Sequence, residues 1–121
     1  MKTIKNLLTA VVVLLSVCVS NAQIKNKTTK TVKINGNCSM CKQTMETAAN
    51  VADIAQLNWN ENTQTATLVY DKEKTTSDDI LKRVAKVGYD NERFIAADGV
   101  YNKLHGCCQY DRKIKSETQV K

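Results

Sequence analysis

Two spacings of apolar residues alternate along residues 30–95, and their order leaves few folds open to this 121-residue chain. Apolar residues at every second position are typical of a strand with one buried face, whereas steps of three and four indicate one face of a helix. Asparagine and glycine interrupt the pattern where turns are expected. The predicted elements are strand 31–34, helix 41–52, strand 54–59, strand 66–70, helix 77–87 and strand 89–95.

The order strand, helix, strand, strand, helix, strand predicts an α+β domain with a ferredoxin-like βαββαβ fold. Such a sandwich has one antiparallel four-stranded sheet with two helices on one face, and here it would occupy residues 30–95. A C-terminal extension over residues 96–121 carries two adjacent cysteines. The chain is long enough for one domain and too short for two.

The first 22 residues have the three-part layout of a secretory signal peptide. Two lysines precede an apolar run over residues 7–19, and the small residues Ser20 and Ala22 stand just ahead of a cleavage site before Gln23. The apolar run is shorter than the roughly 20 residues of a membrane span, which favours cleavage over an uncleaved anchor. We therefore expect a protein exported to the periplasm or secreted, in which residues 23–29 form a flexible polar leader.

The distribution of charge argues against a nucleic-acid partner. The chain has 18 Lys and Arg against 12 Asp and Glu, and removal of the two lysines in the expected signal peptide leaves a net charge of +4. The basic residues are scattered, without the concentrated stripe that a nucleic-acid surface presents. A solvated exterior accounts for the lysines.

Four cysteines remain after the expected cleavage, and Cys38 and Cys41 form a C-x-x-C motif where the first strand gives way to the first helix. The N–H groups and dipole at a helix N-terminus stabilise thiolates. Thiolates are soft ligands that select Cu(I), Zn(II) or similar ions, and structural zinc takes four ligands. Two sulfurs alone suit two-coordinate Cu(I), so the motif predicts a metal site for Cu(I), with Hg(II) or Zn(II) as the next candidates.

The other two cysteines, Cys107 and Cys108, follow His105 in the C-terminal extension. About ten residues separate them from the end of the last predicted strand, and at roughly 3.3 Å per residue these could reach back to the C-x-x-C motif. Three interpretations stay open: a composite site with Cys38 and Cys41, an independent metal or redox site such as a vicinal disulfide, or a structural coincidence. His105 is a further possible ligand or a surface residue.

The segment KINGNCSMC over residues 33–41, followed by a helix, resembles the metal-binding loop of the heavy-metal-associated domain. Residues 66–71 and 87–89 extend the resemblance. That family includes copper chaperones, N-terminal modules of metal-exporting ATPases and the periplasmic mercuric-ion binding protein. The resemblance implies a βαββαβ fold, metal held by Cys38 and Cys41, and transfer of the ion by ligand exchange.

The loop departs from the family pattern in one respect. The family places a methionine and one further residue between a glycine and the first cysteine, whereas Gly36 and Cys38 are separated by Asn37 alone. The loop is therefore one residue shorter and lacks the methionine that packs beneath it. Met40, between the two cysteines, is either a bystander or a thioether ligand.

These features predict a binding protein and not an enzyme: an exported metallochaperone or scavenger that passes a soft ion to a membrane metal transporter or a copper protein. It would act as a monomer or as a metal-bridged dimer. The alternative is a periplasmic thiol–disulfide redox protein, because C-x-x-C at a helix N-terminus is also a redox arrangement. The order of elements is not that of thioredoxin, and the chain has no proline to supply the cis-proline expected beside such a site.

Overall fold

The computed structural model describes residues 23–114 and 118–120. The expected signal peptide over residues 1–22 lies outside them. Within the described ranges, no helix has the length and apolar character needed to cross a membrane. The elements are β1 (Lys27–Lys33), α2 (Ser39–Ala49), β2 (Ala55–Asn60), β3 (Thr65–Asp71), α3 (Ser77–Lys86), β4 (Phe94–Ile95), α4 (Asp98–Tyr101), the 3-10 helix η1 (Gly106–Cys108) and β5 (Thr118–Gln119).

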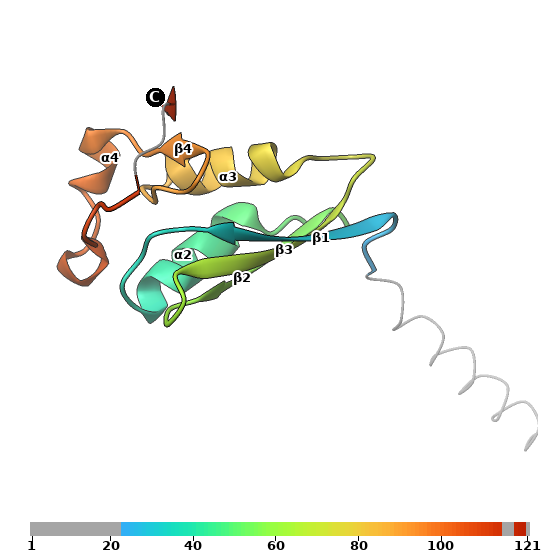
Figure 1. Cartoon of the computed structure of the whole chain (residues 1–121), viewed down its shortest axis with the longest axis horizontal. Helices are drawn as coiled ribbons and strands as arrows, with labels where there is room; N and C mark the ends of the chain where they lie inside the picture. The colour runs from blue at the N-terminus through green and yellow to red at the C-terminus, as the bar shows by residue number, and fades with distance from the viewer. Residues whose placement is uncertain (1–22, 115–117, 121) are drawn as a thin grey trace, which may run out of the picture.

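The predicted α+β, ferredoxin-like fold class is confirmed. In the described part of the chain, β1, β3 and β2 form an antiparallel sheet in that order, and α2 and α3 lie together beside it (Figure 1). Alternate residues of the strands point to the helices, as the period of two requires. The buried cluster takes its sheet residues from Val32, Ala55, Leu57, Trp59, Ala66 and Leu68, and its helix residues from Cys41, Met45, Ala49, Ile80, Leu81 and Val84.

The fourth strand is much shorter than the predicted strand 89–95. The segment joins the edge of β1 through a single antiparallel bridge between Ile34 and Asn91, and only Phe94–Ile95 forms a strand, paired in parallel with β5. The side-chain oxygen of Asn91 accepts hydrogen bonds from the backbone N–H groups of Arg93 and Phe94, at 3.1 and 3.0 Å. This turn draws the chain away from β1, because an asparagine side chain can replace a strand partner as acceptor.

The start of the domain also differs from the prediction. Residues 27–29, assigned above to a flexible leader, form the first part of β1, and Lys27 lies opposite Asp71 at the far end of β3. Ile24, before the strand, is buried. Pairing with β3 therefore extends β1 at its N-terminal end, beyond the alternating residues 31–34 that predicted the strand. The hydrogen bonds of this pairing join backbone groups, which every residue except proline has, so they do not need an alternating pattern of side chains.

The loop between β1 and α2 rests on the core. The indole N–H of Trp59 donates to the carbonyl oxygen of Ile34 at 2.9 Å, and both side chains are buried. A Cβ on Gly36 would stand 2.7 Å from the Met45 methyl carbon and 2.8 Å from the Trp59 ring. Trp59 and Met45 thus fill the space beneath a loop that is one residue shorter than in the family pattern, and they require glycine above them.

We predict that Gly36→Ala lowers the free energy of unfolding by about 1–3 kcal/mol, the usual cost of forcing an extra carbon into a packed site. Urea denaturation followed by Trp59 fluorescence measures the change. Gly99→Ala is the matched control, because no atom lies within 4 Å of a Cβ added at Gly99. Equal stability of the two variants would contradict the packing described for this loop.

Candidate metal centre

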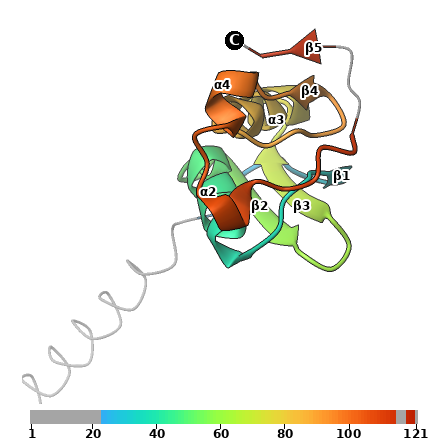
Figure 2. The ribbon, with the colours of Figure 1, turned by 90° about the vertical axis from the view of Figure 1, so that its left-hand side faces the viewer.

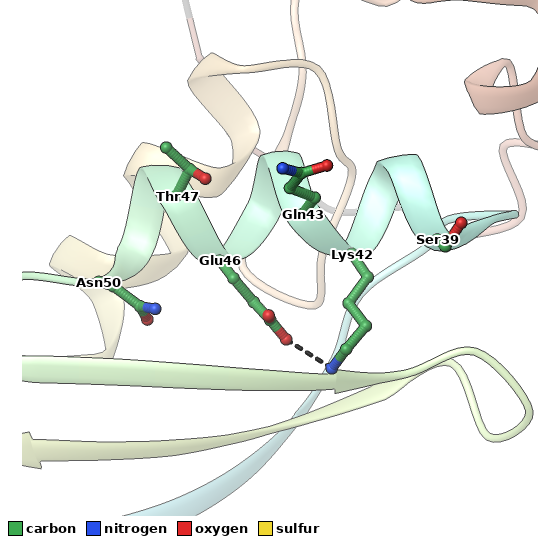
Figure 3. Close-up of a pocket in the computed structure, with 6 residues that line it drawn as sticks. All are labelled: Ser39, Lys42, Gln43, Glu46, Thr47 and Asn50. Atoms are coloured by element: carbon green, nitrogen blue, oxygen red, sulfur yellow. Dashed lines mark hydrogen bonds and ion pairs between the residues drawn. The ribbon is translucent and has the colours of Figure 1, made fainter.

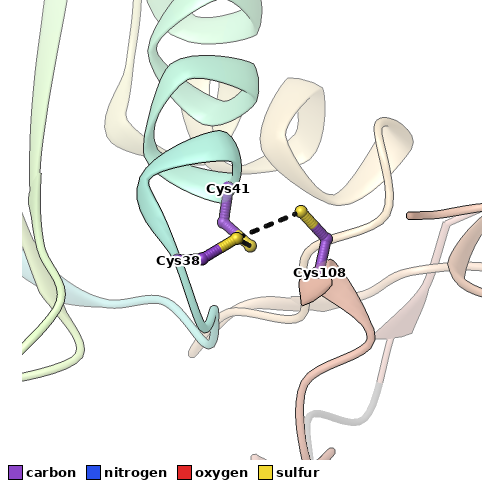
Figure 4. Close-up of side chains that lie close together, drawn as sticks. All are labelled: Cys38, Cys41 and Cys108. Carbon is purple, nitrogen blue, oxygen red and sulfur yellow. Dashed lines mark hydrogen bonds between the residues drawn. The ribbon is translucent and has the colours of Figure 1, made fainter. Parts of the chain in front are cut away.

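The local fold places Cys38 and Cys41 on one side of the helix entrance. Cys38 is the N-cap of α2 with extended backbone angles, φ −142° and ψ 174°, and its carbonyl oxygen accepts from the Lys42 N–H at 3.2 Å. Cys41 lies one turn into the helix and is buried, whereas Cys38 is partly exposed. Residues three apart share a helix face, and the two sulfurs are 3.6 Å apart (Figure 4).

The C-terminal extension returns to this point. Viewed from the end of the molecule, the segment after α4 runs past the start of α2 (Figure 2). There η1 begins with a hydrogen bond from the Cys108 N–H to the His105 carbonyl oxygen at 2.7 Å. The turn directs Cys108 inward and leaves Cys107 exposed. The Cys108 sulfur is 3.5 Å from that of Cys38, and the Cys107 sulfur is 3.1 Å from it.

Tyr110 and Arg112 hold the extension in place. The Tyr110 ring stacks on Tyr89 with 5.7 Å between centroids, and its hydroxyl donates to the Gly88 carbonyl oxygen and accepts from the Asp90 N–H, both at 2.7 Å. The Arg112 guanidinium forms a two-pronged pair with the buried Asp90 carboxylate at 2.8 Å. Such forked pairs combine strength with a defined geometry, so the two cysteines before them are held against α2.

The structure therefore brings together cysteines that are about seventy residues apart in sequence. The sulfurs of Cys38, Cys41 and Cys108 all lie within 4.8 Å of one another, which is compact enough for one ion. Cys107 borders this group without belonging to it, and the exposed His105 also lies outside it. Of the three interpretations of the extension, this geometry favours the composite site. Metal ligation by these residues stays a prediction.

The close thiols shift one another's pKa values. Desolvation, the largest single influence, raises the pKa of Cys38, but interactions with the Cys107 side chain, the Cys41 backbone and the Cys108 and Cys41 side chains together lower it from 9.0 to about 7. Burial, followed by the hydrogen bond with Cys41, raises the pKa of Cys108. The hydrogen bond with Cys38 raises the pKa of Cys107. Of these three thiols, Cys38 is the one prepared to lose its proton first.

The Tyr89 hydroxyl borders the inner side of the thiol group. It is fully buried and meets no hydrogen-bond partner of acceptable geometry among the described residues. Burial first, and then the nearness of Cys108 and Cys41, raises the pKa of Tyr89. A neutral hydroxyl without a partner is costly in a protein interior. Its proton is therefore available to a charged sulfur when the thiols ionise.

A hollow beside α2 has different chemistry from the thiol group. It runs along one side of α2 and is lined by Ser39, Lys42, Gln43, Glu46, Thr47 and Asn50 (Figure 3). Lys42 directly follows Cys41 in sequence, but its ammonium group pairs with Glu46 at 2.6 Å and donates to Asn58 at 2.7 Å. Its positive charge is thereby turned toward β2, and the lining offers hard oxygen and nitrogen groups without a sulfur.

The sequence indicated some of these residues and missed others. Cys38 and Cys41 stand in a recognisable motif, and the Tyr89 position beside the loop follows from the expected fold. The contact of Met40 with Cys107, at 3.7 Å between sulfurs, and the anchoring of the tail by Tyr110 and Arg112 were not foreseen. The only feature of the sequence that pointed to this anchoring was Tyr110, two positions after the cysteine pair. Its role becomes visible only once the structure places Gly88 and Asp90 beside its hydroxyl group.

The fold and the thiol group together make a small α+β domain with a cluster of cysteines at a helix entrance. The solved structure of a CopZ metallochaperone superposes on it with a TM-score of 0.50 at 23% identity, covering 53% of this chain and 98% of that one. A copper-exporting P-type ATPase of Staphylococcus saprophyticus is 37% identical over 60 residues, which are 49% of this chain but only 8% of the ATPase. No protein-family model matches the chain. The structural likeness shows the fold, and with the sequence match it confirms the resemblance to the heavy-metal-associated family.

We predict that alkylation of Cys38 in the reduced, metal-free protein follows a titration with a midpoint near pH 7. Below this pH the thiol is protonated and unreactive, and above it the thiolate forms, about two pH units earlier than at the ordinary pKa of 9.0. Cys107→Ala should move the midpoint upward, because the hydrogen bond of the Cys107 side chain is the largest influence that lowers the Cys38 pKa. Mass spectrometry of peptides alkylated at a series of pH values measures both midpoints. A Cys38 midpoint near 9 in the unmodified sequence would contradict this arrangement.

Proposed function

We propose that this chain is an exported metal carrier that binds Cu(I) through Cys38, Cys41 and Cys108 and passes it on by ligand exchange. The observation that carries the proposal is the convergence of these three sulfurs within 4.8 Å of one another. Two come from the helix entrance and the third from the docked extension. A non-enzymatic carrier fits a centre in which the described residues gather thiols and no acid–base pair beside them.

The chemistry of the donors supports copper first. Thiolates are soft ligands and select Cu(I), whereas structural zinc takes four ligands in a closed tetrahedron. Cys107 lies outside the compact group, and the exposed His105 does not complete it. Among the proteins to which the chain is similar, one is a metallochaperone and another is a copper-exporting ATPase. Hg(II) and Zn(II) become competitors to be tested beside Cu(I).

The burial of the three sulfurs suggests a direction for exchange. Cys41 and Cys108 are buried, whereas Cys38 is partly exposed and has the lowered pKa. An incoming thiolate from a partner would therefore reach the ion at the Cys38 side first. The partner would be a membrane metal transporter or a copper protein with its own cysteines. Tyr89, whose buried hydroxyl faces Cys41 and Cys108, would keep water from the inner side and donate to a charged sulfur.

The proposed location is the periplasm or the exterior of the cell, and it rests on the signal-peptide pattern of residues 1–22. Exported proteins meet an oxidising compartment in which exposed thiols form disulfides. All four described cysteines are free, and a bound soft ion would protect them by occupying their sulfurs. Whether the carrier is a monomer or a metal-bridged dimer stays a prediction.

We predict that the purified, reduced protein takes up Cu(I) from a chromophoric Cu(I) chelator under anaerobic conditions. The double variant Cys38→Ser/Cys41→Ser should lose this uptake. Cys108→Ser should weaken affinity by at least the roughly 10- to 100-fold that loss of an outer-shell partner costs a metal site. His105→Ser is the matched control in the same extension and should bind as the unmodified protein does.

The same titration separates the alternatives. If Cys108→Ser leaves the uptake unchanged, the extension supplies no ligand to the site. If Zn(II) or Hg(II) binds more tightly than Cu(I) in competition, that ion replaces Cu(I) as the proposed cargo. No uptake of any of the three ions, together with rapid turnover in an insulin-reduction assay, would favour the thiol–disulfide redox protein.

We predict that the protein isolated from cell fractions begins at Gln23 and is found outside the cytoplasm. Removal of residues 1–22 takes away the two lysines and the apolar run, which are the parts that the export machinery reads. Intact-mass measurement of the fractionated protein gives the N-terminus. An Ala22→Leu variant should be processed poorly, because a cleavage site needs a small residue there. Full-length protein in the cytoplasm would refute export.

A further inference from the structure

The centre described above leaves two sulfurs unused. Cys107 is exposed, and its sulfur is 3.1 Å from that of Cys38 and 3.8 Å from that of Cys108. The thioether sulfur of Met40 lies 3.7 Å from the Cys107 sulfur, on a side chain that is 43% exposed. Single exposed methionines are ordinary, but burial gives no reason for a thioether to lie against a thiol from the other end of the chain.

We infer that Cys38, Cys107 and Met40 form a second Cu(I) position on the rim of the site, with the Cys38 thiolate bridging it to the inner position. The inference rests on the proposed function, because the inner ion must bind for a bridging thiolate to exist. The inner ion displaces the thiol protons of Cys38, Cys41 and Cys108 to solvent, and the rim ion displaces only that of Cys107, because Cys38 is by then a thiolate. The Met40 thioether carries no proton and binds as a neutral ligand.

The distances identify Cys38 as the shared ligand. Its sulfur lies 3.6 Å from Cys41, 3.5 Å from Cys108 and 3.1 Å from Cys107, so that it contacts every other thiol of the centre. A single four-thiolate site would instead require all four sulfurs to surround one point. The group of mutually close sulfurs contains Cys38, Cys41 and Cys108 but not Cys107. The arrangement therefore consists of two overlapping sets joined at Cys38, one buried and one exposed.

Charge permits a second monovalent cation. One Cu(I) among several thiolates leaves an excess of negative charge in a partly buried place, where uncompensated charge is costly. The adjacent Lys42 does not supply the counter-charge, because its ammonium group is paired with Glu46 at 2.6 Å. A further Cu(I) at the rim replaces the Cys107 proton one for one, so it adds no further negative charge, and it stabilises the Cys107 thiolate.

The nature of the rim ligands restricts the ion. A thioether is a soft donor that suits Cu(I), and carboxylate or carbonyl oxygens suit harder ions. The rim set combines two thiolates with one thioether and leaves one side open to solvent. An ion held there would be the first to meet the thiolates of a partner, whereas the inner ion is enclosed by Cys41, Cys108 and Tyr89.

Native mass spectrometry of the reduced protein, titrated anaerobically with chelated Cu(I), tests the inference. The unmodified chain should bind two copper ions as a monomer, and Cys107→Ser should bind one. Met40→Leu keeps the size of the side chain and removes the sulfur, so it should bind the second ion about 10-fold more weakly. His105→Ser is the matched control on the other side of Cys107 and should retain both ions. X-ray absorption should show a copper–copper path in the unmodified protein that is missing in Cys107→Ser.

The possible failures can be told apart. Binding of no copper by the unmodified protein refutes the proposed function itself. A single ion whose affinity falls in Cys107→Ser overturns the second position in favour of one four-thiolate site. A single ion in both proteins, or a second ion that appears only in dimers, also overturns it. Because Cys107 and Met40 are exposed, circular dichroism of both variants should be unchanged.

Discussion

The site depends on the hydroxyl group of Tyr110. By donating to the Gly88 carbonyl oxygen and accepting from the Asp90 N–H, it fastens the C-terminal extension to the turn after α3, and Arg112 reinforces this through the Asp90 carboxylate. Only two residues separate Tyr110 from Cys107, so the position of the tyrosine fixes that of the cysteine pair. Without this attachment the site would contain the thiols of Cys38 and Cys41 but not those of Cys107 and Cys108.

On the other side of the site, core packing fixes the loop between β1 and α2. The loop before Cys38 lies on Trp59 and Met45, and the Trp59 N–H bonds the Ile34 carbonyl oxygen beneath it. The loop is thus braced by core residues even though it lacks the methionine that the family places there. Two rigid supports, one a packed loop and one a hydrogen-bonded tail, hold the thiols at short range before any ion arrives, and such preorganisation lowers the entropic cost of binding.

Much of the fold could be read from the sequence, because strands such as 66–70 and the helix 77–87 repeat their apolar residues at unambiguous spacings. The truncated fourth strand could not be foreseen, since it depends on one side chain, Asn91, competing for backbone N–H groups. The C-x-x-C pair was predictable because its chemistry is local. Whether Cys108 or His105 would join it was not, because that depends on tertiary contacts of Tyr110 and Arg112 with residues about twenty positions earlier.

The separation of Cys38 and Cys108 along the chain has a mechanical consequence. An ion bound to both would act as a cross-link that closes a loop of about seventy residues around nearly the whole domain. By the chain-entropy estimate for disulfides, closure of such a loop is worth roughly 4 kcal/mol against unfolding. Loading would then tighten the entire domain, and departure of the cargo would loosen it, so that resistance to proteolysis would report whether the carrier is full or empty.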